Sequence, residues 1–266
     1  MNLPALDIFM ILPSLALVFF RVSGVIMTAP ILGSPVIPMR IRAALTLVLT
    51  LVTFPLLGNQ VPQTATLSDV IAGAAGELMI GAAIGLALTI MLLAGEVAGT
   101  LIGQQAGLVL GEVVNPLQEH QASVLGQIYT VVLACVFLVA GGHRALVAAV
   151  LDTFAVIPLL TSRDTQSMVL LLSETLTAAF VAGIRIAGPA MIALFLAAIS
   201  LAVLSRAMPQ LNILTVGFTV QVFLALAVVW LGLNFCEGIL LDVISDGLDA
   251  VRGAFQLPPG RVRFSY

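Results

Sequence analysis

Long runs of apolar residues alternate with short polar stretches along this chain. The apolar runs occupy residues 5–37, 43–57, 67–102, 122–142, 145–157, 167–204 and 213–236. A helix needs about 20 apolar residues to cross the hydrocarbon core of a bilayer, and several of these runs reach that length. The pattern therefore predicts an all-α membrane protein whose helices end at prolines, glycines and polar turns.

Two of the runs, 67–102 and 167–204, are longer than one membrane crossing needs. A helix over residues 67–102 would be about 54 Å long at about 1.5 Å per residue, whereas the bilayer core is about 30 Å thick. This run contains no proline, is rich in glycine and alanine, and carries Glu77 and Glu96. Such a surface suits packing against other helices better than contact with lipid. We therefore expect long helical hairpins rather than a simple series of membrane crossings.

Glycines recur every four residues near the end of that run. They are Gly95, Gly99, Gly103, Gly107 and Gly111. Small residues at this spacing form one face of a helix and let a second membrane helix approach closely. We assign Gly95, Gly99 and Gly103 to helix packing.

The polar stretch at residues 103–121 separates two strongly apolar runs. The helix that enters it is predicted to end near Asn115 and Pro116, because a residue before proline avoids the α conformation. Polar backbone without helical hydrogen bonds is tolerated at membrane depth only inside protein or a water-filled cavity. The stretch is therefore either a loop outside the membrane or a re-entrant element in a pore, and lipid exposure alone favours the loop.

Charged residues inside apolar runs make further predictions. Arg21 follows a long apolar run, so it faces protein, water or a partner, or else it extends toward the membrane surface. Residues 237–255 are amphipathic. One face carries Leu240, Ile244, Leu248 and Val251, and the other carries Asp242, Asp246 and Asp249.

Composition agrees with a membrane protein. Of the 266 residues, 61% are hydrophobic and 9% are charged, which is typical of integral membrane proteins. The net charge of −3 is spread along the chain and argues against nucleic-acid binding. The arginines follow several different segments, so the charge distribution gives no clear membrane topology.

No constellation of catalytic residues is apparent. His120 and His143 have no Cys or carboxylate at metal-ligand spacing, and Cys135 and Cys236, within apolar runs, are predicted to be two buried free thiols. The chain contains no phosphate-binding loop and no dinucleotide-binding turn. We therefore expect no enzymatic activity, no metal and no cofactor. One alternative is a small-molecule transporter in which Glu77, Glu96 and Arg185 act as coupling residues at the membrane midplane.

A motif near the C-terminal third points to a family. The run RAMPQLNI at residues 206–213, with Arg206, Pro209, Gln210 and Asn212, resembles the signature of the FliR/SctT family of type III export-gate proteins. Further stretches agree with the family in the same order along the chain. They are Arg21 with Thr28-Ala29-Pro30, Ile37-Pro38-Met39-Arg40, the glycine-rich run ending in Asn115-Pro116, Gly141-Gly142-His143 with Asp152-Thr153-Phe154, and Phe235-Cys236-Glu237.

The resemblance implies an architecture and partners. It implies long helical hairpins packed in a hetero-oligomeric export channel, with a FliP-like part at about 1–205 fused to a FliQ-like part at about 206–266. The expected partners are several copies each of FliP and FliQ, FlhB at the channel entrance, the lipid membrane and exported unfolded flagellar proteins. The expected location is the bacterial inner membrane at the flagellar basal body, with part of the chain raised toward the periplasm. The injectisome protein SctT is the alternative within the family.

The resemblance also reverses the interpretation of the polar stretch. In this family the corresponding stretch is a plug loop inside the closed channel. The chain departs from the family pattern at Asn115, where aspartate is usual, and at Glu112, where the family is more apolar. The implied plug-loop residues are Gly107, Leu108, Val109, Leu110, Gly111, Glu112, Val113, Val114, Asn115, Pro116, Leu117, Gln118, Glu119 and His120.

Overall fold

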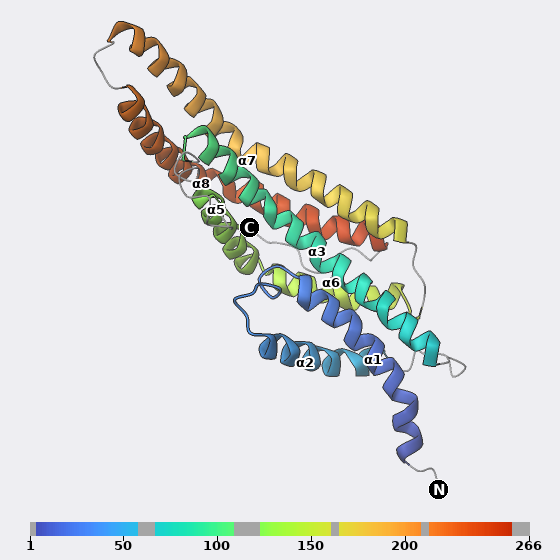
Figure 1. The fold of residues 1–266 in the computed structure, drawn as a ribbon. Helices are drawn as coiled ribbons and strands as arrows, with labels where there is room; N and C mark the ends of the chain where they lie inside the picture. Colours follow the sequence, from blue (N-terminus) through green and yellow to red (C-terminus); the bar gives the residue numbers. More distant parts are fainter. Residues whose placement is uncertain (1–3, 58–66, 109–122, 161–164, 209–212, 257–266) are drawn as a thin grey trace. The chain divides into compact units, whose positions relative to one another are not determined.

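The computed structural model describes residues 4–57, 67–108, 123–160, 165–208 and 213–256. These residues form α-helices joined by turns, and no strand occurs among them (Figure 1). The helices are α1 (Pro4–Thr28), α2 (Met39–Leu57), α3 (Leu67–Gln105), α5 (Val124–Val139), α6 (Gly142–Val156), α7 (Thr165–Ala207) and α8 (Ile213–Phe255). The all-α prediction is confirmed.

Among the residues that the structure describes, three helices are long and apolar enough to cross a membrane. The candidate spans are Ile11–Thr28, Ser68–Gln105 and Gln166–Ala207. A fourth exists if Val124–Val139 and Gly142–Val156 together make one span. The sequence prediction of unusually long apolar helices is confirmed by α3 and α7, which contain 39 and 43 residues.

The chain divides into two compact units. The first unit consists of Met1–Met91, Ala140–Leu176 and Ile244–Tyr266, and the second consists of Leu92–Val139 and Thr177–Val243. The first unit therefore contains α1, α2, α6, the beginning of α3 and α7, and the end of α8. The second unit contains α5 together with the remaining parts of α3, α7 and α8.

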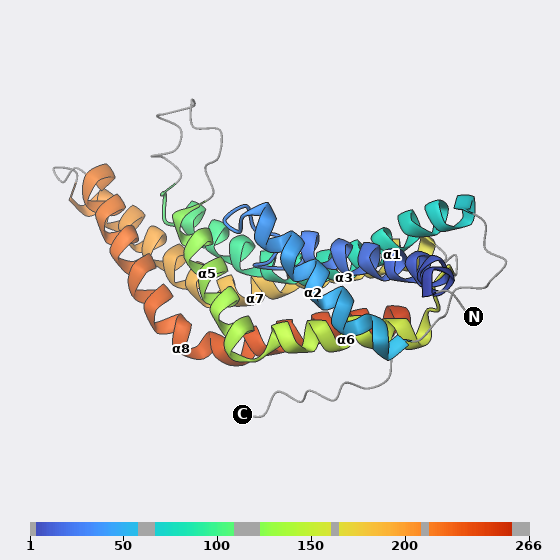
Figure 2. The ribbon, with the colours of Figure 1, turned by 90° about the horizontal axis from the view of Figure 1, so that it is seen from below.

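In the first unit, α1 and α3 pack with their backbones in close contact (Figure 2). A Cβ atom at Gly24 would lie 2.8 Å from Ala82 N, and one at Gly85 would lie 2.8 Å from Ala29 N. The Thr28 hydroxyl donates to the Ala82 carbonyl at 3.1 Å. These contacts require glycine at the crossing, because any larger residue would push the two helices apart.

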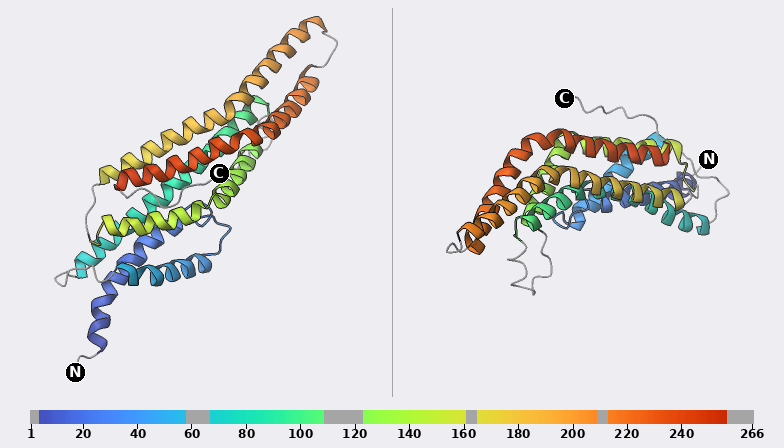
Figure 3. Two further views of the ribbon diagram at one scale, coloured as in Figure 1. Left: turned by 180° about the vertical axis from the view of Figure 1, so that it is seen from behind. Right: turned by 90° about the horizontal axis from the view of Figure 1, so that it is seen from above.

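In the second unit, α7 and α8 lie side by side along the parts that belong to this unit (Figures 1 and 3). The end of α3 packs against α5, and their contact again uses glycine. Many large apolar side chains of α7 are exposed in the isolated chain. In this unit they include Phe180, Val181, Ile184, Ile192, Phe195, Leu196, Ile199 and Val203.

Helix α3 ends about ten residues before the predicted position, so the sequence prediction of an end near Asn115 and Pro116 is wrong. Gly107 has a φ of 77°, which is the left-handed conformation. Its N–H donates to Gln104 O at 3.1 Å, and the N–H of Leu108 donates to Gly103 O at 3.0 Å. This pair of bonds is a Schellman cap, which ends a helix by satisfying its last carbonyls. A local glycine cap therefore acts before the proline can.

The amphipathic tail is part of a longer helix. Residues 213–236 and 237–255 join in one helix, α8. On its last turns Ile244, Leu248 and Val251 are buried, and Asp242, Asp246 and Asp249 are exposed, as the pattern predicts. Of the two thiols predicted to be buried, that of Cys135 is exposed on α5, so this prediction is wrong, and the side chain of Cys236 lies outside the described residues. The position of Cys135 within an apolar run says that the helix is hydrophobic but not which side faces its neighbours.

Candidate functional site

A buried arginine lies at the centre of the first unit. The side chain of Arg21, on α1, is 0% exposed, and that of Glu77, on α3, is 2% exposed. Arg21 Nε donates to Glu77 Oε2, so the two buried charges neutralise each other. An unpaired charge at such a position would carry a large desolvation cost.

The rest of the guanidinium group is held by α6 and the residues that follow it. Arg21 Nη2 donates to Ile157 O at 3.1 Å, and Nη1 donates to Thr153 Oγ1 at 3.4 Å. The Arg21 Cζ atom lies 4.2 Å from the centroid of the Phe154 ring, which is a cation–π contact. We name Arg21, Glu77, Thr153, Phe154 and Ile157 the arginine clamp.

The arginine clamp joins segments that are far apart in the sequence. It is made possible by the glycine contact between α1 and α3, since Gly81 of α3 faces the Arg21 carbonyl directly. Glu77 lies one helical turn before Gly81, and its second oxygen accepts from the N–H of Leu160 at 3.4 Å. The carboxylate therefore fixes both α1 and the chain segment after α6.

The structure decides between the two interpretations of Arg21. The side chain is directed into protein and does not extend to a membrane surface. Its partner Glu77 was not identifiable from spacing, because the two residues are 56 positions apart. The signal in the sequence was that each is an isolated charge within an apolar run. Gly81 and Gly85 were also missed, although they have the same four-residue spacing as the later glycines.

The transporter alternative gains nothing from this arrangement. Glu77 is occupied by Arg21 in the first unit, whereas Glu96 and Arg185 belong to the second unit. Within the described segments, no group of three or more His, Cys, Asp or Glu side chains could hold a metal ion.

The glycines assigned to helix packing face α5 of the same chain. A Cβ atom at Gly95 would lie 3.1 Å from the carbonyl carbon of Tyr129, and one at Gly99 would overlap the backbone of Leu125 and Gly126. A Cβ atom at Gly103 would lie 2.8 Å from Ser123 Oγ. Ser123 Oγ also donates to the Gly99 carbonyl at 3.4 Å. The backbones of α3 and α5, the helices that precede and follow residues 109–122 in the sequence, are therefore in direct contact.

Only the beginning of the predicted plug loop lies in the described part of the chain. Gly107 and Leu108 form the cap of α3. A Cβ atom at Gly107 would lie 3.6 Å from the ring of Phe218 on α8. Residues 109–120 of the predicted loop lie outside the described residues.

The family motif is divided in the same way. Arg206 lies in the last turn of α7, and its side chain is exposed. Pro209, Gln210 and Asn212 lie outside the described residues.

Comparison with known proteins decides the family. Residues 12–247 match the sequence model of the family described as Bacterial export proteins, family 1. The chain belongs to this family. The match spans both compact units and contains the arginine clamp, the glycines of α3 and the motif at 206–213.

Curated members of the bacterial export family agree over most of their length. The flagellar biosynthetic protein FliR of Escherichia coli is 30% identical over 238 residues, which cover 85% of this chain and 90% of that protein. FliR of Caulobacter vibrioides is 26% identical over 235 residues, or 88% of this chain and 94% of that protein. These matches confirm the resemblance to FliR.

A further relative matches over a shorter part of this chain. The surface presentation of antigens protein SpaR of Shigella flexneri is 26% identical over 155 residues, or 58% of this chain and 60% of that protein. The names of these relatives describe flagellar biosynthesis and surface presentation rather than an enzymatic reaction. Together with the apolar helices, the family identifies this chain as a membrane protein of a bacterial export apparatus.

Proposed function

We propose that this chain is a FliR-type component of the flagellar type III export gate in the bacterial inner membrane. The single observation that carries the proposal is the match to FliR proteins over 85–88% of this chain. The match to SpaR covers 58% of the chain, so we favour the flagellar system over the injectisome. In this role the chain forms part of a channel through which unfolded flagellar proteins pass.

The proposal includes partners from the same apparatus. Several copies of FliP and FliQ surround this chain, and FlhB lies at the channel entrance. Residues at about 1–205 take a FliP-like place and those at about 206–266 take a FliQ-like place. The exposed apolar side chains of α7 support this proposal, because surfaces of that kind need other helices or lipid to cover them. Part of the assembly stands above the membrane, toward the periplasm.

We propose further that residues 107–120 form a plug that closes the channel at rest. Support comes from the two ends of the stretch. Helix α3 is capped sharply at Gly107, and α3 packs backbone against backbone on α5, which begins at Val124. The described residues therefore hold the helices on both sides of the stretch in place. The predicted loop also carries the apolar run Leu108-Val109-Leu110, which can seal a narrow pore by packing.

Conductance of the purified complex in planar bilayers tests the plug. Deleting residues 111–118 is expected to leave the complex assembled, as judged by native mass measurement, and to raise the ion leak at rest. A matched control replaces residues 58–66, the connection between α2 and α3, with glycine and serine, and should leave the leak unchanged. An unchanged leak in an intact complex that lacks 111–118 would remove the plug assignment.

A further inference from the structure

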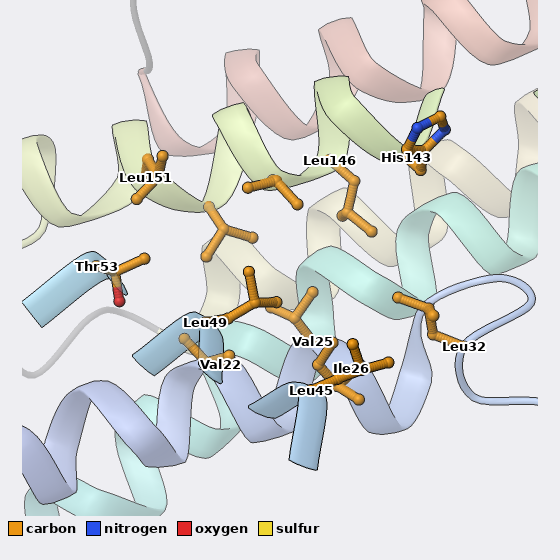
Figure 4. A pocket seen from close by; sticks show the side chains of 12 residues that line it. Val22, Val25, Ile26, Leu32, Leu45, Leu49, Thr53, His143, Leu146 and Leu151 are labelled. Atoms are coloured by element: carbon orange, nitrogen blue, oxygen red, sulfur yellow. The ribbon is translucent and has the colours of Figure 1, made fainter. Parts of the chain in front are cut away.

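An apolar cavity of about 210 Å³ lies within the first unit, between α1, α2 and α6 (Figure 4). Its walls are almost entirely aliphatic. They are formed by Val22, Val25, Ile26, Leu32, Leu45, Leu49, Thr53, His143, Leu146, Val147, Val150 and Leu151. The cavity is separate from the arginine clamp, whose residues do not line it. It is also remote in sequence from residues 107–120.

The two ends of the cavity differ in chemistry. Thr53 and Leu151 lie at one end, and His143 and Leu32 lie at the other (Figure 4). The second end is where α6 begins, since His143 is the second residue of that helix. It is also the end toward which α2 begins, because Leu45 lies nearer to it than Thr53 does (Figure 4). The N-terminus of a helix favours an anion.

Arginines accompany both of these helix starts. Arg42 lies one turn before Leu45, and its Nε and Nη2 atoms donate to Ile37 O at 3.0 and 2.9 Å. That bond holds the side chain near the turn that precedes α2. Arg144 follows His143 and lies one turn before Val147, and its side chain is exposed. Both arginines thus lie in the first turns of helices that begin toward the His143 end of the cavity.

We propose that this cavity binds an anionic phospholipid of the surrounding bilayer. One acyl chain occupies the slot between α1, α2 and α6, and the phosphate group lies against Arg42, Arg144 and the N-terminal turns of α2 and α6. Basic pockets between membrane helices hold anionic headgroups in this way. The proposal needs only a membrane protein, so it does not depend on the export function.

The dimensions and lining favour an acyl chain over the other possible occupants. An apolar cavity of about 150 Å³ stays free of water and takes up apolar ligands instead, and this one is larger. A cavity of about 210 Å³ is too small to take in a helix of a partner protein, which is about 10–12 Å in diameter with its side chains. Charge at one end and aliphatic walls elsewhere match the two parts of a phospholipid.

Native mass spectrometry of the purified full-length chain tests the proposal. After removal of lipid by detergent, phosphatidylglycerol and phosphatidylcholine with identical acyl chains are added separately. Two arginines beside one headgroup correspond to about a 30-fold preference for phosphatidylglycerol. The change Arg144→Gln, at an exposed position, should lower phosphatidylglycerol binding about fivefold and leave phosphatidylcholine binding unchanged. Equal affinity for the two lipids would overturn the headgroup assignment.

Two further variants separate the slot from the general lipid surface. Val147→Trp fills the cavity from its partly exposed wall and should remove the tightly bound lipid. Arg185→Gln, on α7 in the other unit, removes a charge elsewhere and should change nothing. Retention of the lipid by Val147→Trp would overturn the proposal. A photo-reactive residue at position 147 should form adducts with lipid in native membranes, and adducts with another protein would show that a partner side chain fills the cavity instead.

Discussion

At the scale of single residues, the arginine clamp makes the strongest claim about stability. Glu77→Gln removes the negative charge that faces the buried guanidinium group of Arg21. Removing one partner of a buried ion pair costs about 3–5 kcal/mol. We therefore expect the purified variant to unfold at a much lower temperature, or a much lower denaturant concentration, than the parent. Thermal unfolding in detergent measures the change.

A double variant tests whether the two charges affect stability only as a pair. Arg21→Met combined with Glu77→Leu replaces both charges by apolar groups of similar size, and such replacements are often neutral or stabilising. The double variant should therefore recover most of the lost stability. Glu174→Gln on α7 is the matched control, since Glu174 is exposed, and it should behave like the parent. A Glu77→Gln protein that unfolds together with the parent would contradict the clamp.

Arg206 leads to a prediction about function rather than stability. Its side chain is exposed in the last turn of α7, and substitutions at exposed positions usually change stability by no more than about 0.5 kcal/mol. Arg206→Ala should therefore lower motility in swimming assays while the protein level in membranes stays nearly constant. If the level falls in step with motility, Arg206 serves folding alone.

A residue's role can be predicted from sequence when it depends on nearby positions, but not when it depends on a distant segment. An arginine in an apolar run must be satisfied by something, so the burial of Arg21 follows from the cost of an unpaired charge. The identity of its partner depends on how α1 crosses α3, and a separation of 56 residues leaves no trace in local spacing. The cation–π contact with Phe154 was equally invisible, because it depends on where α6 lies.

At the scale of helices, glycine packing between α3 and α5 can be tested with two matched substitutions. Gly99→Ala places a methyl group against the backbone of Leu125 and Gly126, and overpacking of this kind costs about 1–3 kcal/mol. Gly76→Ala, on the same helix, meets nothing within 4 Å and should gain up to about 1 kcal/mol from helix propensity. Unfolding midpoints in detergent should therefore move in opposite directions. Equal shifts for the two variants would refute the contact.

Helix positions were predicted well where periodicity and length were decisive. The long helices α3 and α7 follow from uninterrupted apolar runs, and the break between α5 and α6 follows from Gly141, which has a φ of 78°. The end of α3 was misplaced because the Schellman cap at Gly107 looks, in sequence, like one more member of the glycine series. Residues 213–236 and 237–255 look like separate segments in the sequence, because an uncharged run changes there to an amphipathic one. The backbone nevertheless continues through this change as one helix, α8.

At the scale of the whole molecule, the chain has surfaces that it cannot cover by itself. Large apolar side chains are exposed along α2 as well as α7. Composition predicted a membrane protein, and the motifs predicted the family, through which FliP, FliQ and FlhB are proposed as partners. The apolar cavity of the first unit was also beyond sequence reasoning, since α6, which completes its walls, lies far along the chain from α1 and α2.

The central claim is that this chain works as a subunit of an export gate. The most direct test is to co-express the tagged chain with FliP and FliQ, purify it in mild detergent and measure the native mass of the product. We predict one complex that contains all three proteins. A chain that purifies without FliP and FliQ, and that alone supports uptake of a small molecule into proteoliposomes, would contradict the account.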